Sequence, residues 1–246
     1  MTNSKLCANI NPKKKFTRYV KRIGIQQYNQ IGGVIMSHYT EPDFKNIALL
    51  TIDMQNDFVL PGAISEIQGT YGVVPNILKL LQFARNKNIT IIHVIRFYKA
   101  DGSNADLCRK SIIESGTKIV CPDTDGANIV SVLKPNNNPL DTKNLINGSM
   151  QNISENEWII YKSRWGAFYK TKLEQFLLNK DINTLIFSGC NFPNCPRTSI
   201  YEASERDFKI VLASDAMSQT YQKGLEEMHK IGVSLLTTAE IINKLK

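Results

Sequence analysis

The chain of 246 residues is predicted to adopt an α/β fold with a mainly parallel sheet. Continuous apolar runs such as residues 47–52 are typical of strands that are covered on both faces. These runs alternate with segments whose apolar residues recur at helical spacing, the pattern of a parallel sheet with right-handed helical crossovers. The hydrophobic content of 42% and charged content of 21% fit one folded domain and exclude a disordered chain.

The regular elements can be placed in order along the chain. The helix expected over residues 73–87 has Pro75 in its first turn, where proline is tolerated, and residues 90–94 are rich in β-branched side chains, as strands are. The expected strands are residues 47–52, 89–94, 158–161, 184–188, 210–213 and 233–237. The expected helices are residues 73–87, 105–114, 168–178, 195–206, 221–231 and 239–245.

Residues 97–155 interrupt this alternation. They are rich in glycine, proline, asparagine and aspartate, and the short helix at residues 105–114 is the only regular element expected there. So much irregular sequence inside a compact domain is typical of a lid or pocket wall. We therefore expect this stretch to help select the substrate.

The net charge of +8 is concentrated at the N-terminus. Residues 1–35 contain seven basic and no acidic residues, which leaves 23 basic and 22 acidic residues in the remainder. We expect residues 1–35 to be a basic, flexible extension and residues 36–246 to be the folded domain, with Met36 as an alternative start. An electrostatic arm for RNA or an anionic membrane is the other interpretation, but no aromatic interleaving or motif supports it. We expect no nucleic-acid partner.

The cysteines and the hydropathy pattern indicate a cytoplasmic protein. The five cysteines are odd in number and follow no apolar signal peptide, so we expect reduced thiols rather than a disulfide framework. No stretch approaches the roughly 20 apolar residues that a membrane span needs.

Residues 185–208 place two cysteines between a strand and a helix. The apolar run ends at Gly189, and helical spacing resumes near Cys195. Such a junction is where α/β proteins place nucleophiles and anion sites, and the positive end of the helix macrodipole favours a thiolate. The segment predicts a cysteine nucleophile, Cys195 in preference to Cys190. Two buried structural cysteines are the alternative.

Three expected strand ends carry chemically active side chains. These are Asp53, Lys162 and, just after its strand, Cys195. Because ligands bind at the carboxyl ends of parallel strands, we expect these groups to meet there. A carboxylate can take and return a proton, an ammonium can stabilise negative charge, and a thiolate can attack a carbonyl carbon. Each residue taken singly has another interpretation. Asp53 could cap a turn, Lys162 could be a solvated strand end, and Cys195 could be a packed core residue.

The three residues belong to longer stretches, which are residues 48–58, residues 162–168 and the run from Ser188-Gly189 to Cys195. These stretches resemble the motifs of the isochorismatase-like cysteine hydrolase superfamily, which includes nicotinamidases and N-carbamoylsarcosine amidases. The resemblance extends over roughly residues 46–238. It implies a three-layer α/β/α sandwich with a six-stranded parallel sheet, often assembled into dimers or tetramers. It also implies that Asp53 is the general base and acid, Lys162 the charge stabiliser and Cys195 the nucleophile.

The resemblance also implies how an oxyanion would be bound. In the family, a glycine at a strand end precedes the nucleophile by six residues, as Gly189 precedes Cys195. The family then has a non-proline cis peptide, which falls here between Cys190 and Asn191. The amide N–H groups of Asn191 and Cys195 would together form the oxyanion hole.

The sequence departs from the family in two places. The family's common loop after the glycine is Val-Ala-Thr-(Asn/Asp)-x, whereas residues 190–194 read Cys-Asn-Phe-Pro-Asn, which leaves the substrate open. Nicotinamidases usually carry an Asp-x-His metal motif after the second strand, but residues 96–101 contain no histidine. We therefore expect no metal and no other cofactor. Isochorismatases proper cleave a vinyl ether and lack the cysteine, so its presence favours a C–N hydrolase.

The substrate is expected to be a small molecule in an aromatic, basic pocket. Phe58, Trp165 and Phe168 match the family's aromatic wall positions, and Arg164 and Arg197 are candidates for binding a carboxylate. The alternative for the three aromatic residues is plain core packing, and the alternative for the two arginines is a surface or subunit-interface ion pair. The expected function is a metal-independent cysteine hydrolase, a homo-oligomer, that cleaves an amide, ureido or carbamoyl C–N bond through a thioester. A catalytically silent or regulatory binding protein on this scaffold is the alternative.

Overall fold

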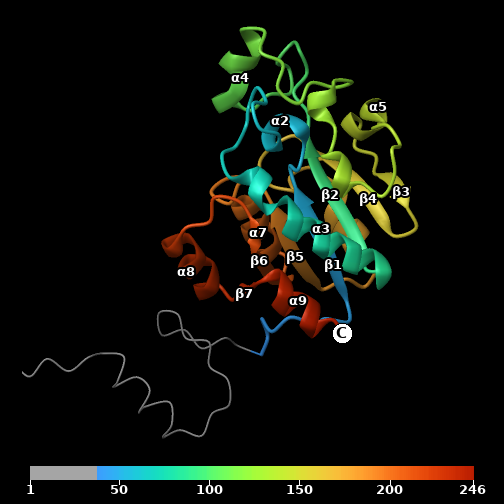
Figure 1. The fold of residues 1–246 in the computed structure, drawn as a ribbon, viewed down its shortest axis with the longest axis vertical. Coiled ribbons are helices and arrows are strands. Elements are labelled where there is room, and N and C mark those ends of the chain that lie inside the picture. Colours follow the sequence, from blue (N-terminus) through green and yellow to red (C-terminus); the bar gives the residue numbers. More distant parts are fainter. Residues whose placement is uncertain (1–37) are drawn as a thin grey trace, which may run out of the picture.

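The computed structural model describes residues 38–246 and contains a central sheet with helices on both faces (Figure 1). The extension expected over residues 1–35 lies outside the described residues. The strands are β1 (Ile47–Ile52), β2 (Thr90–Arg96), β3 (Gln151–Ser154), β4 (Glu157–Lys162), β5 (Thr184–Gly189), β6 (Lys209–Met217) and β7 (Ser234–Leu236). The α-helices are α2 (Asn56–Val59), α3 (Thr70–Asn86), α4 (Leu107–Glu114), α5 (Thr142–Ile146), α6 (Leu173–Leu178), α7 (Cys195–Ser204), α8 (Gln222–Lys230) and α9 (Thr238–Lys244).

The sheet has seven strands, one more than the six that the sequence predicts. Their order is β3-β4-β2-β1-β5-β6-β7, and every neighbouring pair is parallel except β3 and β4. The additional strand β3 is short, largely polar and alternately buried, so its local pattern resembles a loop. It becomes a strand because a tight turn returns the chain as β4, whose exposed edge it covers.

The third expected helix is also shorter than predicted. The sequence predicts helix from Phe168, whereas α6 begins at Leu173. The residues before it form a turn, because Phe168 donates its N–H to the Glu202 carboxylate of α7 at 2.8 Å instead of entering a helix.

Two apolar clusters on opposite faces of the sheet make the three layers. Side chains alternate between the faces along a strand, so Leu49 packs toward α3 and Leu50 toward α7. The first cluster contains Ile77 and Leu81 of α3. Burial on both faces explains why the central strands read as continuous apolar runs.

The order of the strands creates a switch point at β1. The chain runs from β1 through β2 to β4 on one side, and then crosses over to β5 on the other side. The loops that leave β1 and β5 therefore diverge at the carboxyl edge of the sheet, where α/β folds bind ligands. In Figure 1 this edge is the upper end, which carries α2 and α4.

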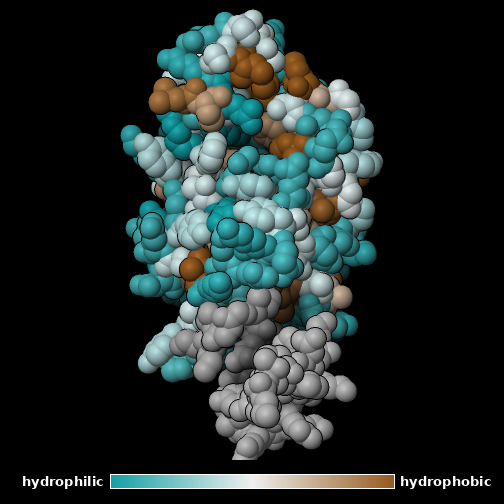
Figure 2. Space-filling model, turned by 90° about the vertical axis from the view of Figure 1, so that its left-hand side faces the viewer, coloured by the Kyte–Doolittle hydropathy of each residue, from teal (hydrophilic) through white to brown (hydrophobic). Residues whose placement is uncertain are grey.

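The surface at this upper end is partly apolar. Figure 2 shows hydrophobic side chains gathered there, while most of the remaining visible face is hydrophilic. Leu107 and Ile112 of α4 are among the exposed apolar residues. Within residues 38–246, no helix is both long and apolar enough to cross a membrane.

Candidate active site

Asp53 directly follows β1 at the switch point and is 4% exposed. Its φ of 53° lies in the left-handed region, which is uncommon for a non-glycine residue and concentrates at functional sites. This conformation is held by hydrogen bonds, because its N–H donates to Val94 and its carbonyl accepts from Gln55. The backbone thereby turns the carboxylate out of the strand.

Lys162 forms a buried ion pair with this carboxylate. Its side chain is inaccessible to solvent, and its Nζ lies 2.9 Å from Asp53 Oδ2 and 3.3 Å from the carbonyl of Arg164. Asp53 Oδ1 is buried and has no hydrogen-bond partner among the described residues. A buried lone oxygen of this kind is free to accept a proton.

Gly189 allows β5 to lie close to β1. A Cβ at this position would come within 2.3 Å of the Ile52 carbonyl, and the φ of 117° is one that side chains disfavour. The following peptide bond, between Cys190 and Asn191, is cis.

The two cysteines of this segment lie on opposite faces of the sheet. Cys190 is buried in the cluster on the α3 side, and its thiol lies 3.1 Å from the Asp53 carbonyl, to which it donates. Cys195 begins α7 on the other face and is partly exposed. Cys190 therefore supports the Asp53 backbone, whereas Cys195 is the thiol that a ligand can reach.

The Cys195 thiol is protonated near neutral pH. Burial raises its pKa to about 12, the negative charge of Asp53 adds to this effect, and Lys162 opposes it. The positive end of the helix macrodipole favours a thiolate at this position, whereas burial and the adjacent carboxylate favour the neutral thiol. A thiolate must therefore form by proton transfer within the site.

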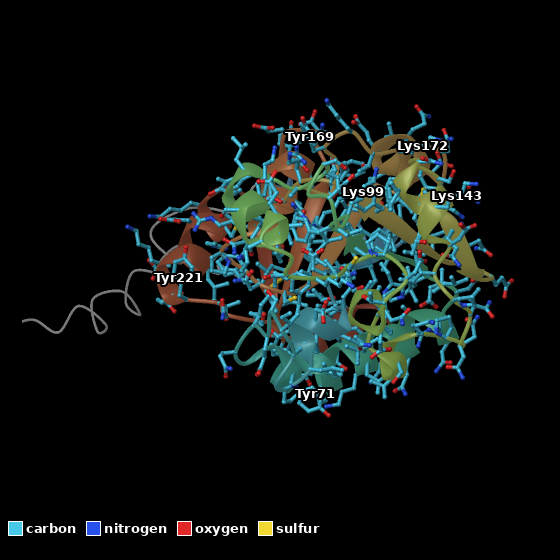
Figure 3. The ribbon with its side chains drawn as sticks, turned by 90° about the horizontal axis from the view of Figure 1, so that it is seen from above. Tyr71, Lys99, Lys143, Tyr169, Lys172 and Tyr221 are labelled. Carbon is cyan, nitrogen blue, oxygen red and sulfur yellow. The ribbon has the colours of Figure 1, made fainter. Side chains whose placement is uncertain are left out.

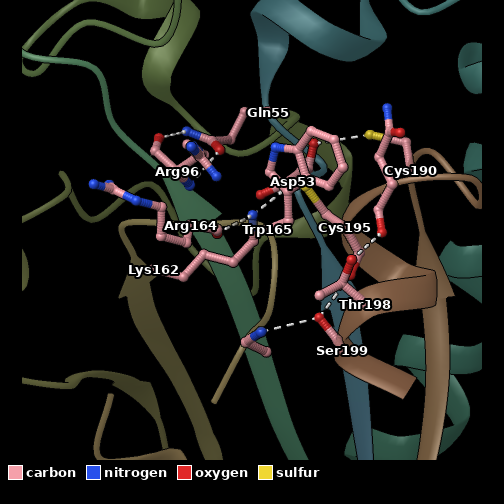
Figure 4. A network of polar contacts seen from close by, with 12 residues as sticks. Asp53, Gln55, Arg96, Lys162, Arg164, Trp165, Cys190, Cys195, Thr198 and Ser199 are labelled. Atoms are coloured by element: carbon pink, nitrogen blue, oxygen red, sulfur yellow. Dashed lines mark hydrogen bonds and ion pairs between the residues drawn. The ribbon is translucent and has the colours of Figure 1, made fainter. Parts of the chain in front are cut away.

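The first turns of α7 connect the cysteine to the loop after Lys162. Ser199 Oγ donates to the Cys195 carbonyl at 2.7 Å and accepts the Ala167 N–H at 3.0 Å (Figure 4). One hydroxyl thus links the segments that carry the thiol and the ammonium.

Arg96 is a site residue that the sequence analysis did not single out. It ends β2, is 2% exposed, and pairs in register with Lys162 of β4. Its Nη2 forms an ion pair with Asp106, and its charge acts on Asp53 and Cys195. The sequence signal for Arg96 was an arginine at the end of a buried strand, but only the fold shows that its charge acts on Asp53 and Cys195.

The expected pocket residues have mixed positions. Trp165 is exposed and donates from Nε1 to Asp106 at 3.2 Å. Phe168 lies in the core beside Phe208. Phe58 packs against the apolar cluster on the α3 side of the sheet. These placements favour the core alternative for Phe58 and Phe168.

The two expected arginines are engaged elsewhere. Arg164 is exposed and donates to the Asn104 carbonyl at 3.1 Å. The Arg197 guanidinium pairs with Glu227 and donates to the Tyr221 hydroxyl, so it joins α7 to α8. For Arg197 the structure matches the ion-pair alternative.

A basic cleft of about 250 Å³ lies at the end of β4, and its lining includes neither Asp53, Arg96, Lys162 nor Cys195. It is lined by the residues on either side of Lys162 and by three lysines, and its described lining contains no acidic residue. Figure 3 looks down on this end of the molecule and labels two of these lysines, Lys99 and Lys172. Within residues 38–246, no group of three or more histidine, cysteine, aspartate or glutamate side chains could hold a metal ion.

The fold and the site together define the class of protein. It is an α/β/α sandwich whose sheet edge brings together an acid, an amine and a thiol. The chain belongs to the isochorismatase family, because the model described as Isochorismatase domain matches residues 47–240.

Individual relatives agree with this assignment. A probable inactive nicotinamidase of Arabidopsis thaliana is 30% identical over 204 residues, which cover 80% of this chain and 95% of that protein. A ureidoacrylate amidohydrolase of Methylobacterium radiotolerans is 22% identical over 228 residues, covering 84% and 80%. The crystal structure of an isochorismatase family protein from Desulfovibrio vulgaris has a TM-score of 0.70 and 31% identity, over 81% of this chain and 98% of that chain.

Proposed function

We propose that the chain is an amidohydrolase that cleaves the C–N bond of a small amide, ureido or carbamoyl compound, with Cys195 as the nucleophile. The observation that carries this proposal is the meeting of Asp53, Lys162 and Cys195 at the switch point of the sheet. The name of one relative, a ureidoacrylate amidohydrolase, supports this substrate class.

In the first half of the reaction, the Cys195 thiol transfers its proton to Asp53 Oδ1, the oxygen that has no partner in the resting site. The thiolate attacks the carbonyl carbon, and the C–N bond breaks as the tetrahedral intermediate collapses. The leaving nitrogen takes the proton from Asp53. The products of this half are a free amine or ammonia and a thioester on Cys195.

In the second half, Asp53 takes a proton from water, and the resulting hydroxide attacks the thioester. Collapse of the second intermediate releases a carboxylic or carbamic acid, and the proton held by Asp53 returns to the Cys195 sulfur. Lys162 remains charged throughout and stabilises the negative charge that moves between carboxylate and sulfur.

The developing oxyanion would be bound by backbone amides. The N–H groups of Asn191 and Cys195 are not used in a hydrogen bond among the described residues. Each well-placed donor of this kind contributes about 3–4 kcal/mol to the transition state.

The test is ammonia release across nicotinamide, carbamoyl amino acids, ureido compounds and biuret, by the native chain and by Cys195→Ala. We expect at least one compound to be hydrolysed by the native chain alone. Mass spectrometry of acid-quenched enzyme should then find the acyl group on the peptide that contains Cys195.

Saturable binding of these compounds without turnover would instead favour the alternative, a catalytically silent binding protein. The relative from Arabidopsis thaliana, described as probably inactive, is the reason to measure binding as well as turnover.

A further inference from the structure

We propose that the Arg96 guanidinium binds a carboxylate of the substrate, so that the preferred substrates are amide, ureido or carbamoyl compounds that also carry an acid group. This inference rests on the proposed hydrolase function and narrows its substrate class.

The Arg96 side chain is buried with unused donors. One of its nitrogens, Nη2, pairs with Asp106, while Nε and Nη1 have no hydrogen-bond partner among the described residues. Buried polar groups in folded proteins nearly always have a partner, and a charged donor without one is especially costly. The two open nitrogens therefore indicate an acceptor that arrives with a ligand.

Arg96 lies on the face of the sheet that carries the proposed nucleophile, and its charge acts on Cys195. Arg96 and Lys162 are register partners at the ends of β2 and β4, so both side chains leave the same face of the sheet. That face also carries Val94 and the cluster under α7, the helix that begins with Cys195. Figure 4 shows Arg96 on the same side of the site as Asp53 and Lys162.

Arg96 is held at its backbone and at its side chain before any ligand binds. The Gln55 side-chain amide accepts the backbone N–H of Arg96 and donates to its backbone carbonyl, both at 2.8 Å. The guanidinium carbon lies 4.8 Å from the centre of the Tyr98 ring, whose hydroxyl donates to Asp106. A donor fixed in this way loses little freedom on binding, which is the property of a built recognition site.

The charges around Arg96 favour an anion over a neutral oxygen. The Asp106 carboxylate also accepts hydrogen bonds from Tyr98, Cys108 and Trp165, so its negative charge is shared among four donors. A guanidinium matches a carboxylate in charge and in planar geometry.

The experiment compares matched pairs of substrates that differ only in the acid group, such as N-carbamoylglycine and N-carbamoylglycinamide, with equivalent pairs in the ureido and carboxamide series. The native chain should show the higher kcat/KM for the acids. Arg96→Lys keeps the charge but loses the open donors, and it should lower kcat/KM for the acids by about 10- to 150-fold, the value of a charged hydrogen bond. Its effect on kcat/KM for the neutral members should be at least about tenfold smaller than its effect on the acids. Arg109→Gln, which changes an exposed arginine of α4, is the matched control and should change neither.

A second variant guards against misfolding. The double variant Arg96→Gln/Asp106→Asn removes both charges of the buried ion pair, so no unpaired charge remains buried. It should also abolish the preference for acids. If Arg96→Lys lowered kcat/KM equally for the acids and for the neutral members, Arg96 would be purely structural and the inference would be overturned. Equal or better hydrolysis of the neutral members by the native chain would overturn it as well, while leaving the hydrolase proposal intact.

Binding to Cys195→Ala, measured by calorimetry, separates this inference from the proposed function. If the native chain hydrolyses none of the compounds, the hydrolase proposal fails. The carboxylate site would still be supported if acids bind the Cys195→Ala variant but do not bind the double variant Arg96→Lys/Cys195→Ala. If no acid of the panel binds Cys195→Ala, the inference is overturned.

Discussion

Lys162 Nζ lies 2.9 Å from Asp53 Oδ2, although the two residues end strands that are separated by β2. The lysine reaches over the neighbouring strand, and both side chains are almost completely buried. This ion pair occupies one carboxylate oxygen and leaves the other for the Cys195 proton.

Replacing Cys195 with alanine should abolish turnover without affecting the fold. The substitution removes one partly exposed sulfur, so the free energy of unfolding should change by no more than about 1 kcal/mol. Ammonia release and urea denaturation would measure the two effects. Cys190→Ala is the comparison, and it should retain measurable turnover. Activity in the Cys195 variant would contradict its role as nucleophile.

Lys162→Met should destabilise the protein by about 3–5 kcal/mol, because it leaves the buried Asp53 carboxylate without its counter-charge. Combining it with Asp53→Asn should recover much of this loss, since no charge then remains buried alone. Urea denaturation of the two single variants and the double variant forms a complete cycle. Strictly additive losses would show that the pair is not coupled.

Alkylation of Cys195 should be slow at neutral pH and should accelerate as the pH rises toward its pKa of about 12. The Asp53 charge raises this pKa, so Asp53→Asn should lower it and speed alkylation at pH 8, even though turnover is lost. Iodoacetamide labelling followed by peptide mass spectrometry measures the rate at each cysteine. Identical pH profiles for the native chain and the variant would argue against electrostatic contact between Asp53 and the thiol.

Glu157 should stabilise the protein in a pH-dependent manner. Burial acts to raise its pKa, but hydrogen bonds from Arg85 and His93 outweigh this and hold the pKa below its ordinary value of 4.5. A lowered pKa means that the stabilisation is present above pH 4.5 and is lost as the pH falls through the folded-state pKa. Glu157→Gln should therefore cost about 3 kcal/mol at pH 7 and progressively less below pH 4.5, as measured by urea denaturation. A constant difference down to pH 3 would contradict this account.

The sequence predicts the central strands and the proposed catalytic residues because their signals are local. A strand buried on both faces must be apolar along its length, so β1 and β5 could be recognised without knowing their neighbours. The residues that follow such strands must lie at the carboxyl edge, which is why Asp53, Lys162 and Cys195 could be grouped in advance. The strand β3 could not be recognised, because its short polar pattern becomes a strand only through pairing with β4.

Only the tertiary structure decided how these side chains interact. It placed Cys190 and Cys195 on opposite faces of one sheet, and it joined Arg197 to Glu227 rather than to the site. It also left two nitrogens of Arg96 without a partner, which no sequence pattern could indicate. The physical reason is that burial along a strand depends on nearby residues in the chain, whereas hydrogen-bond partners and thiol pKa values depend on groups brought together from distant segments.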